Sequence, residues 1–229
     1  MSVAVDTGSP ANFNLTGGSS ASGTVTTAGS DNLLVVTIFA YTGQVYGAVA
    51  DIVTFNSVSM TYGGSANWPT PTGQIFASEV WYLKNPPIGA YTLTLTPNSG
   101  CCGNGSNWNG GAVQAIAFTG ANSVGVIQSA NSASATSVSV ASLSGTNGAS
   151  DLYLAFGVSN PNGPLVSGSN MTNYINGHPA TGWYTSLDTI ASSQTGNAAT
   201  YTQASSADDM FIGVIPILAP IGTAIGWVT

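Results

Sequence analysis

Short runs of β-branched and aromatic residues, separated by clusters of Gly, Ser, Asn and Pro, extend along almost the whole chain. Helical periodicity is absent almost everywhere, and the runs recur at the spacing typical of a sandwich. Continuous apolar runs such as LLVVTIF predict strands covered on both faces, whereas alternating runs such as TLTLT predict half-buried strands. The sequence therefore predicts an all-β fold, an antiparallel β-sandwich of the jelly-roll or Greek-key type.

The predicted strands differ in the strength of this pattern. The stronger ones are residues 33–41, 74–83, 91–96, 112–118, 137–143, 151–158 and 210–215. The weaker ones are residues 12–16, 22–27, 52–55, 57–61, 124–128, 182–189 and 198–202. Residues between these runs, including the single histidine, His178, are expected in loops.

The 229 residues fit one large all-β domain, predicted over residues 1–216 and followed by an apolar tail, residues 217–229. The segments GSDNLLVVTIFAYTG and GASDLYLAFGVSNPNG resemble each other, and an alternating Ser/Thr strand precedes each. This internal echo indicates two pseudo-symmetric halves, near residues 1–120 and 121–216. Two central strands under similar packing constraints would also produce this similarity, and both interpretations stay open.

Charge is scarce, and this excludes several classes of function. Only 4% of the residues are charged, against roughly 25% in typical soluble domains. Lys84 is the only Lys or Arg, and the net charge is −7. Because phosphate contacts need cations, we expect no nucleic acid partner and no attachment to anionic lipid. The last twenty residues are uncharged, but Pro216 and Pro220 argue against a membrane span.

The start of the chain and its cysteines bear on where the protein works. The first ten residues lack the basic region and apolar core of a secretory signal, so we expect synthesis without an export signal. Cys101 and Cys102 are adjacent and cannot join distant strands of one chain. Free thiols, a strained adjacent disulfide and a bond to a neighbouring subunit remain open for them.

No pattern of reactive side chains predicts an enzyme. Asp31 and Asp151 each precede a strong strand, where a carboxylate commonly caps a turn. Asp208 and Asp209 could join a loop carbonyl in a calcium site, but the spaced acidic ladder of a dedicated loop is missing. With one histidine and no nucleophile elbow, we predict no catalytic residue, no cofactor and no metal site.

Exposed aromatic rings are the sequence's main signal for a small ligand, because sugars stack on such rings and bond to neutral amides and hydroxyls. The candidate glycan contacts lie in or beside loops rich in Asn, Gly and Pro. They are Trp68, Trp108, Trp183 and Tyr184. The alternative is that these rings fill the core or contact other subunits, where Tyr and Trp are also enriched.

One stretch carries a more specific motif. Trp81, Tyr82 and Leu83 are followed by Asn-Pro-Pro-Ile-Gly, then an alternating Thr strand, and later by an apolar strand closing with Phe118-Thr119-Gly120. This stretch resembles a β-sandwich module found in phage and viral structural proteins and in bacterial surface proteins. The two prolines remove ladder donors and Gly89 permits a positive φ, so the motif predicts a hairpin turn. Trp81 and Tyr82 should point to opposite faces, one into the core and one toward a loop or partner.

The near-absence of charge and of an export signal, together with this resemblance, leads to one functional hypothesis. We expect a non-enzymatic virion structural protein, a capsid decoration, cement or fibre-type subunit located on the extracellular particle. It would assemble with itself, for example as a trimer, and with a major capsid or other virion protein. The expected assembly residues are Ile217, Leu218, Ile221, Ile225 and Trp227, and packing of this tail on its own domain is the equally open alternative. The alternatives are an extracellular filament or cell-surface subunit assembling by strand addition, and a carbohydrate- or receptor-binding module.

Overall fold

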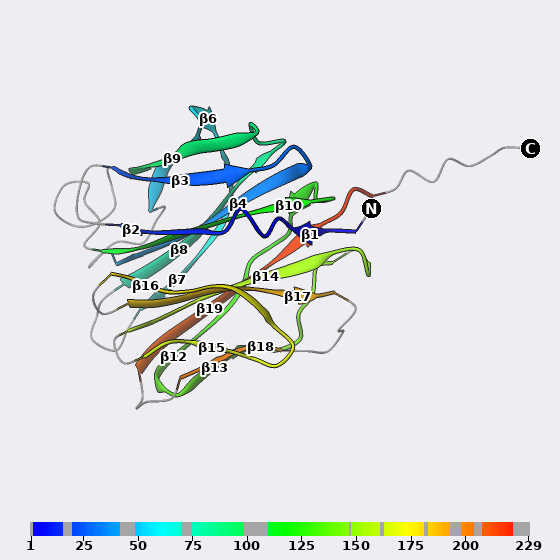
Figure 1. Ribbon diagram of the computed structural model, residues 1–229. Coiled ribbons are helices and arrows are strands. Elements are labelled where there is room, and N and C mark those ends of the chain that lie inside the picture. The colour runs from blue at the N-terminus through cyan, green and yellow to red at the C-terminus, as the bar shows by residue number, and fades with distance from the viewer. Residues whose placement is uncertain are drawn as a thin grey trace, which may run out of the picture.

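The computed structural model describes residues 2–15, 20–41, 49–69, 75–98, 110–146, 148–160, 163–180, 183–192, 198–203 and 208–221. Over these ranges the chain forms antiparallel strands, and the predicted all-β sandwich class is confirmed (Figure 1). No helix in these ranges is long and apolar enough to cross a membrane.

The strands divide between two halves of the chain. The N-terminal half contains β1 (Ala4–Val5), β2 (Ala11–Leu15), β3 (Ala21–Thr27), β4 (Asp31–Tyr41), β5 (Ala50–Phe55), β6 (Val58–Ser59), β7 (Thr61–Pro69), β8 (Ile75–Lys84), β9 (Gly89–Pro97) and β10 (Gly111–Thr119). The C-terminal half contains β11 (Ser123–Val124), β12 (Gln128–Ala135), β13 (Ser137–Val140), β14 (Leu152–Asn160), β15 (Val166–Ser167), β16 (Thr172–Ala180), β17 (Trp183–Ala191), β18 (Ala199–Thr202) and β19 (Asp208–Leu218).

These strands form four sheets that stack in layers (Figure 1). The outer N-terminal sheet has the order β3-β9-β5-β6, and the inner N-terminal sheet has the order β1-β10-β4-β8-β7, with β2 also on β10. The inner C-terminal sheet has the order β11-β19-β14-β17-β16, with β12 also on β19, and the outer C-terminal sheet has the order β13-β18-β15. Each half is thus a sandwich of one inner and one outer sheet, and the two inner sheets face each other.

The two halves share one strand order. Apart from β6, each strand of the N-terminal half has a counterpart at the same place in the sheet and in the sequence of the C-terminal half. The first such pair is β1 and β11, and the last is β10 and β19. Asp31 and Asp151 occupy matching turns, where the amides of Ala28 and Gly148 donate to their carboxylates at 2.6 and 3.3 Å. The predicted turn-capping role of both aspartates is confirmed. The order β2-β10-β4-β8 facing β3-β9-β5-β6 is compatible with a jelly roll.

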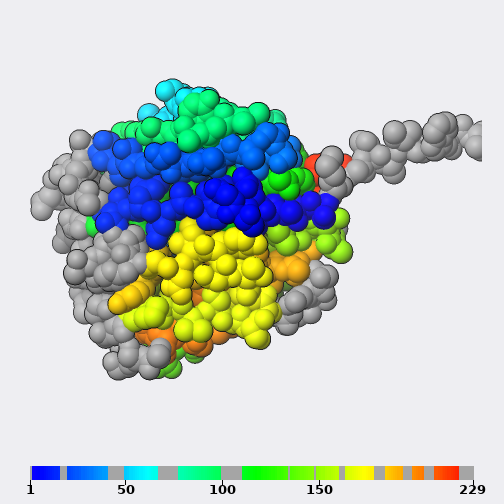
Figure 2. Space-filling view, viewed as in Figure 1, coloured from blue at the N-terminus to red at the C-terminus, as the bar shows by residue number. Residues whose placement is uncertain are grey.

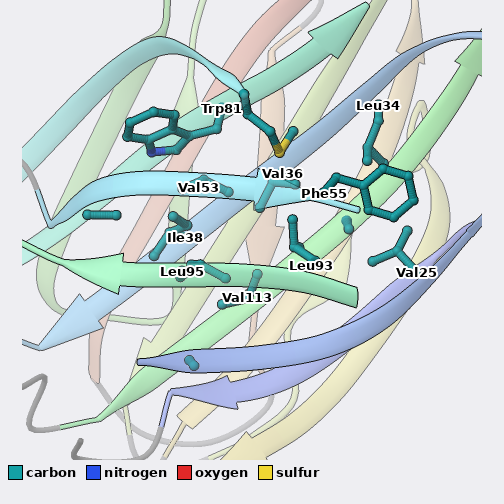
Figure 3. Close-up of a cluster of buried hydrophobic side chains, with 14 of the residues drawn as sticks. Val25, Leu34, Val36, Ile38, Val53, Phe55, Trp81, Leu93, Leu95 and Val113 are labelled. Carbon is teal, nitrogen blue, oxygen red and sulfur yellow. The ribbon is translucent and has the colours of Figure 1, made fainter. Parts of the chain in front are cut away.

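Three apolar cores fill the spaces between the four layers. The first lies within the N-terminal sandwich and includes Phe55, Leu93 and Trp81 (Figure 3). The central core lies between the inner sheets, and the third lies within the C-terminal sandwich. On β4, Leu33 and Val35 enter the central core and Leu34 and Val36 enter the first, which explains the continuous apolar run.

The halves are in direct contact outside the central core as well. Val3 N donates to Ser150 O at 2.8 Å, so the N-terminal segment is bonded to the turn before β14. On the face seen in Figure 2, β2 lies against β16, and the amide of Asn12 is 3.5 Å from the Thr185 hydroxyl. The two sandwiches therefore form one continuous body on this face.

Several predicted boundaries were wrong, mostly at sheet edges. The sequence missed β16 and most of β7 and β12, all of which take an edge position and contain few β-branched residues. His178 lies in β16 and not in a loop. An edge strand is paired on one side only, so it tolerates Gly, Pro and Ser more readily than a central strand does.

The turn after Trp81 also differs from the prediction. β8 belongs to the inner sheet and β9 to the outer sheet, so the Pro-Pro-Ile-Gly turn joins two layers and does not close a hairpin. Gly89 has the expected positive φ, 129°, and Asn85 also has one, 47°. Trp81 enters the first core, but Tyr82 packs against the central core instead of a loop or partner. Both faces of β8 are covered, which the sequence motif alone did not indicate.

Removing a ring from the central core should destabilise the whole protein. Phe156 is fully buried, with its ring centroid 5.7 Å from that of Phe39 and 6.3 Å from that of Phe211. We expect Phe156→Ala to lower the free energy of unfolding by about 3–5 kcal/mol, measured by urea denaturation. The control Ile88→Ala, at a side chain 63% exposed, should change it by less than about 0.5 kcal/mol. A loss below about 1 kcal/mol for Phe156→Ala would contradict this packing.

Candidate functional site

A buried carboxylate, Glu79, joins the two sheets of the N-terminal sandwich. It lies on β8 in the inner sheet and is fully buried. It accepts hydrogen bonds from the amides of Val49 and Ala50, which lead into β5 of the outer sheet. The Trp81 indole also donates to it, at 3.0 Å. Because a buried carboxylate is costly unless hydrogen-bonded, this set of donors fixes β5 over β8.

A second buried carboxylate, Asp188, does the same in the C-terminal sandwich. It lies on β17, the counterpart of β8, and is fully buried. The hydroxyls of Ser167, Tyr201 and Ser186 donate to it at 2.5, 2.6 and 2.7 Å, and the Asn173 amide at 3.1 Å. Ser167 and Tyr201 belong to the outer sheet, so Asp188 also bridges an inner and an outer layer.

Burial raises the pKa values of three side chains, those of Glu79, Asp31 and Tyr201. Burial raises the pKa of Glu79, against the hydrogen bonds that it accepts, and the nearby Asp51 raises it further. Burial likewise raises the pKa of Asp31, against its bond from Ala28, and neighbouring Asp6 adds to the rise. Burial and the charge of Asp188 raise the pKa of Tyr201 well above its ordinary value, so this hydroxyl stays protonated and donates.

The sequence had not singled out Glu79 or Asp188 as buried. Each lies in an alternating or apolar run whose neighbouring residues enter a core. Its position in such a run is the only feature of the sequence that indicates burial. Their oxygens are held by internal donors and face the cores of their own sandwiches. This arrangement stabilises the fold and does not present a reactive group to solvent.

The structure places the predicted glycan contacts on two strands, β7 and β17, and outside the described residues. Trp68 lies at the end of β7 and Trp183 at the start of β17, so each is next to one of two matching connections, β7–β8 and β16–β17. Tyr184 is half-buried on β17. Trp108, like Cys101 and Cys102, lies outside the described residues.

The apolar tail begins later than predicted. β19 continues past Pro216 to Leu218, where Ile217 pairs with Leu152 and Val124 and is fully buried in the central core. The assignment of Ile217 to an assembly surface is therefore wrong, because this side chain is already used inside the fold. Leu218 is half-buried and paired with Ser123, and Ile221 is 81% exposed. Ile225 and Trp227 lie outside the described residues.

Asp208 and Asp209, suggested for a calcium site, lie at the start of a strand. Both residues belong to β19, opposite Ala135 and Asn160. Over the described ranges, no group of three or more His, Cys, Asp or Glu side chains could hold a metal ion.

A polar depression on the solvent face of the outer N-terminal sheet is a feature that the sequence analysis did not single out. It has a volume of about 300 Å³. Its lining residues come from β3, β5, β9 and the β5–β6 turn: Thr24, Thr54, Asn56, Ser57, Ala90, Tyr91, Thr92 and Thr94. The alternation of Thr in TLTLT already placed these hydroxyls on one face, but the hollow depends on the pairing of three strands.

Comparisons with known proteins give little further information. No family model and no curated protein matches the chain. Among solved structures it is similar to the major capsid protein P2 from bacteriophage PM2, with 8% identity and a TM-score of 0.27 over 93% of this chain and 100% of that chain. A "putative secreted protein" from Eubacterium rectale has the same identity and TM-score, over 86% of this chain and 69% of that chain. At this TM-score neither similarity carries an argument.

The raised pKa of Glu79 makes stability depend on pH. The folded protein holds this proton to higher pH than the unfolded chain, so stability is greatest below the ordinary value of 4.5 and falls as pH rises through the folded value. In Glu79→Gln this part of the fall should disappear, leaving the part due to Asp31. Urea denaturation from about pH 4 to 8 measures it. The exposed control Asp51→Asn should keep most of the slope, and an unchanged slope in Glu79→Gln would contradict the assignment.

Loss of one donor to Asp188 should be costly. Tyr201→Phe keeps the ring and removes the hydroxyl that bonds to this buried carboxylate at 2.6 Å. We expect the free energy of unfolding to fall by about 1.5–3 kcal/mol, as for hydrogen bonds to charged groups. The matched control is Tyr62→Phe, at a ring 45% exposed, which should change stability by less than about 0.5 kcal/mol. Equal effects of the two variants would contradict a structural role for Asp188.

Proposed function

We propose that the protein is a non-enzymatic structural subunit of a virion, a capsid decoration, cement or fibre-type protein. The observation that carries this proposal is the placement of charge. Of eight acidic residues, Asp31, Glu79, Asp151 and Asp188 are buried inside the fold, and Lys84 is the only Lys or Arg. The outer surface is therefore even less charged than the sequence suggests.

A neutral surface suits dense packing of copies. Charged groups must be desolvated when surfaces meet, and that cost opposes assembly. Here the two outer sheets present hydroxyl-bearing side chains: Ser22, Thr24, Thr92 and Thr94 on one, Ser137, Ser139, Thr200 and Thr202 on the other. The C-terminal one of these faces can meet a neighbouring copy or a capsid protein through neutral hydrogen bonds, with little dependence on salt or pH.

The fold and the use of the carboxylates also support this role. Jelly-roll sandwiches, with which the strand order is compatible, occur in viral capsid domains as well as in lectins, and this argument is one of fold analogy. The two fully buried carboxylates, Glu79 and Asp188, are bound by internal donors, as expected for groups that hold layers together. Under this proposal the protein works on an extracellular particle.

The apolar segment beginning after Leu218 is the proposed assembly element. Ala219 N donates to the Asp151 carboxylate at 2.7 Å, which fixes the direction in which the chain leaves β19. Ile221 then lies 81% exposed. Packing of Ile221 and the residues after it on a neighbouring subunit would cover this surface. The extracellular filament, assembling by strand addition, is the alternative that uses the same segment.

Self-assembly through this segment is measurable as molar mass by light scattering. We expect the full chain to form a defined oligomer that persists between about 0.01 and 1 M salt, because few charges take part. Ile221→Asp and a chain ending at Ile221 should both shift the mass toward the monomer. The matched control is Val126→Asp, since Val126 is also 81% exposed, and it should leave the oligomer intact. A full chain that stays monomeric, or an oligomer that salt dissociates, would contradict self-assembly through neutral surfaces.

A further inference from the structure

The depression on the outer N-terminal sheet is built from hydroxyls that the strand register places side by side. Thr24 on β3 lies opposite Thr92 on β9, and Thr54 on β5 lies opposite Thr94. Side chains directly opposite each other on one face of a sheet have Cβ atoms about 4.5–5.5 Å apart. Thr94, Thr92 and Ala90 follow one another on the same face of β9. Because Ala90 carries only a methyl group, the surface is hollow there.

The β5–β6 turn forms the other side of the depression. Asn56 and Ser57 have φ values of 49° and 64°, in the left-handed region. A two-residue turn of this kind favours Asn followed by Gly, so a serine at its second position carries a conformational cost. Strained residues of this kind are concentrated at functional sites. Both Asn56 and Ser57 line the depression, which gives a reason for a polar side chain at Ser57.

The chemistry of the lining selects a class of ligand. None of the lining residues that the structure describes is charged, and most carry a hydroxyl or amide group that both donates and accepts hydrogen bonds. An anionic ligand would find no cation among them, and an apolar ligand would leave these polar groups without partners. A neutral polyhydroxylated ligand fits both conditions. The volume of about 300 Å³ is at the lower end for small-ligand sites and matches one or two sugar rings.

We propose that this depression binds a neutral saccharide through Thr24, Thr54, Thr92, Thr94 and the Asn56–Ser57 turn. The site is on the outer N-terminal sheet, whereas Trp68, Trp183 and Tyr184, which the sequence suggested for glycans, belong to strands of the inner sheets. Tyr91 takes part only at the margin, because its ring packs edge-on against Phe55 of the first core, at 5.8 Å. Binding therefore depends on hydrogen bonds and is weak for one site, and it does not require self-assembly.

The matching outer C-terminal sheet supplies a control surface. Ser139 and Thr200 lie opposite each other there, as Thr24 and Thr92 do in the N-terminal half. Their hydroxyls are hydrogen-bonded to each other at 2.8 Å. Thr200→Val therefore removes a hydroxyl from an equivalent face without touching the proposed site.

Nuclear magnetic resonance titration of the full chain tests the proposal. The probes are neutral oligosaccharides ending in glucose, galactose, mannose or N-acetylglucosamine. At least one of them should shift the resonances of the lining residues. Thr94→Val should weaken its binding about fivefold, the effect of one lost neutral hydrogen bond, and Ala90→Leu, which fills the hollow, should abolish it. Thr200→Val should bind like the unaltered protein. If none of the probes shifts these resonances, or if Ala90→Leu binds normally, the site is not a saccharide site.

A second variant separates binding from folding. Ser57→Gly relieves the left-handed strain and removes a hydroxyl from the lining. We expect it to raise the urea midpoint of unfolding while weakening saccharide binding severalfold. A variant that is more stable and binds equally well would overturn the part assigned to the β5–β6 turn.

Discussion

Two middle layers that are apolar on both faces are the constraint on which the rest of this structure depends. The inner sheets meet across the central core, where Phe39, Phe156 and Phe211 pack with ring centroids 5.7–6.3 Å apart. Each inner sheet also needs an outer sheet to cover its second face, since an exposed apolar face would be unstable in water. A four-layer stack satisfies both demands. It also places alternating, half-polar strands on the outside, where their hydroxyls form the two outer faces.

Four of the eight acidic residues lie inside this stack, so few charges remain for its surface. Glu79 and Asp188 occupy matching strands and hold an outer sheet on an inner one, while Asp31 and Asp151 cap matching turns. A hydrogen-bonded carboxylate fixes how one sheet lies on the other, which apolar contacts do not, because its donors must lie at fixed positions. The same arrangement leaves an outer surface of hydroxyls and amides. Assembly and saccharide binding, the two proposed roles, both depend on that neutral surface.

The sequence predicted the central elements better than the edges and the layers. Strong apolar runs such as residues 33–41 and 112–118 identified the inner strands, because burial on both faces leaves a continuous pattern. β7, β12 and β16 left no such pattern, since edge strands gain stability from a neighbour rather than from their own residues. No local pattern indicates which layer a strand joins, so the sequence predicts a hairpin where the β8–β9 turn joins two sheets. Burial of Ile217 and the hollow around Ala90 depend on contacts between distant strands.

Native-state hydrogen exchange tests most directly whether the central core makes the two halves one unit. The amides to follow are those of β4 and β10 in the N-terminal half and of β14 and β19 in the C-terminal half. If the inner sheets depend on each other, the slowest amides of all four strands should exchange through one opening whose free energy equals that of global unfolding. Two separate groups with different opening free energies, one in each half, would show that the sandwiches unfold independently and would contradict this account.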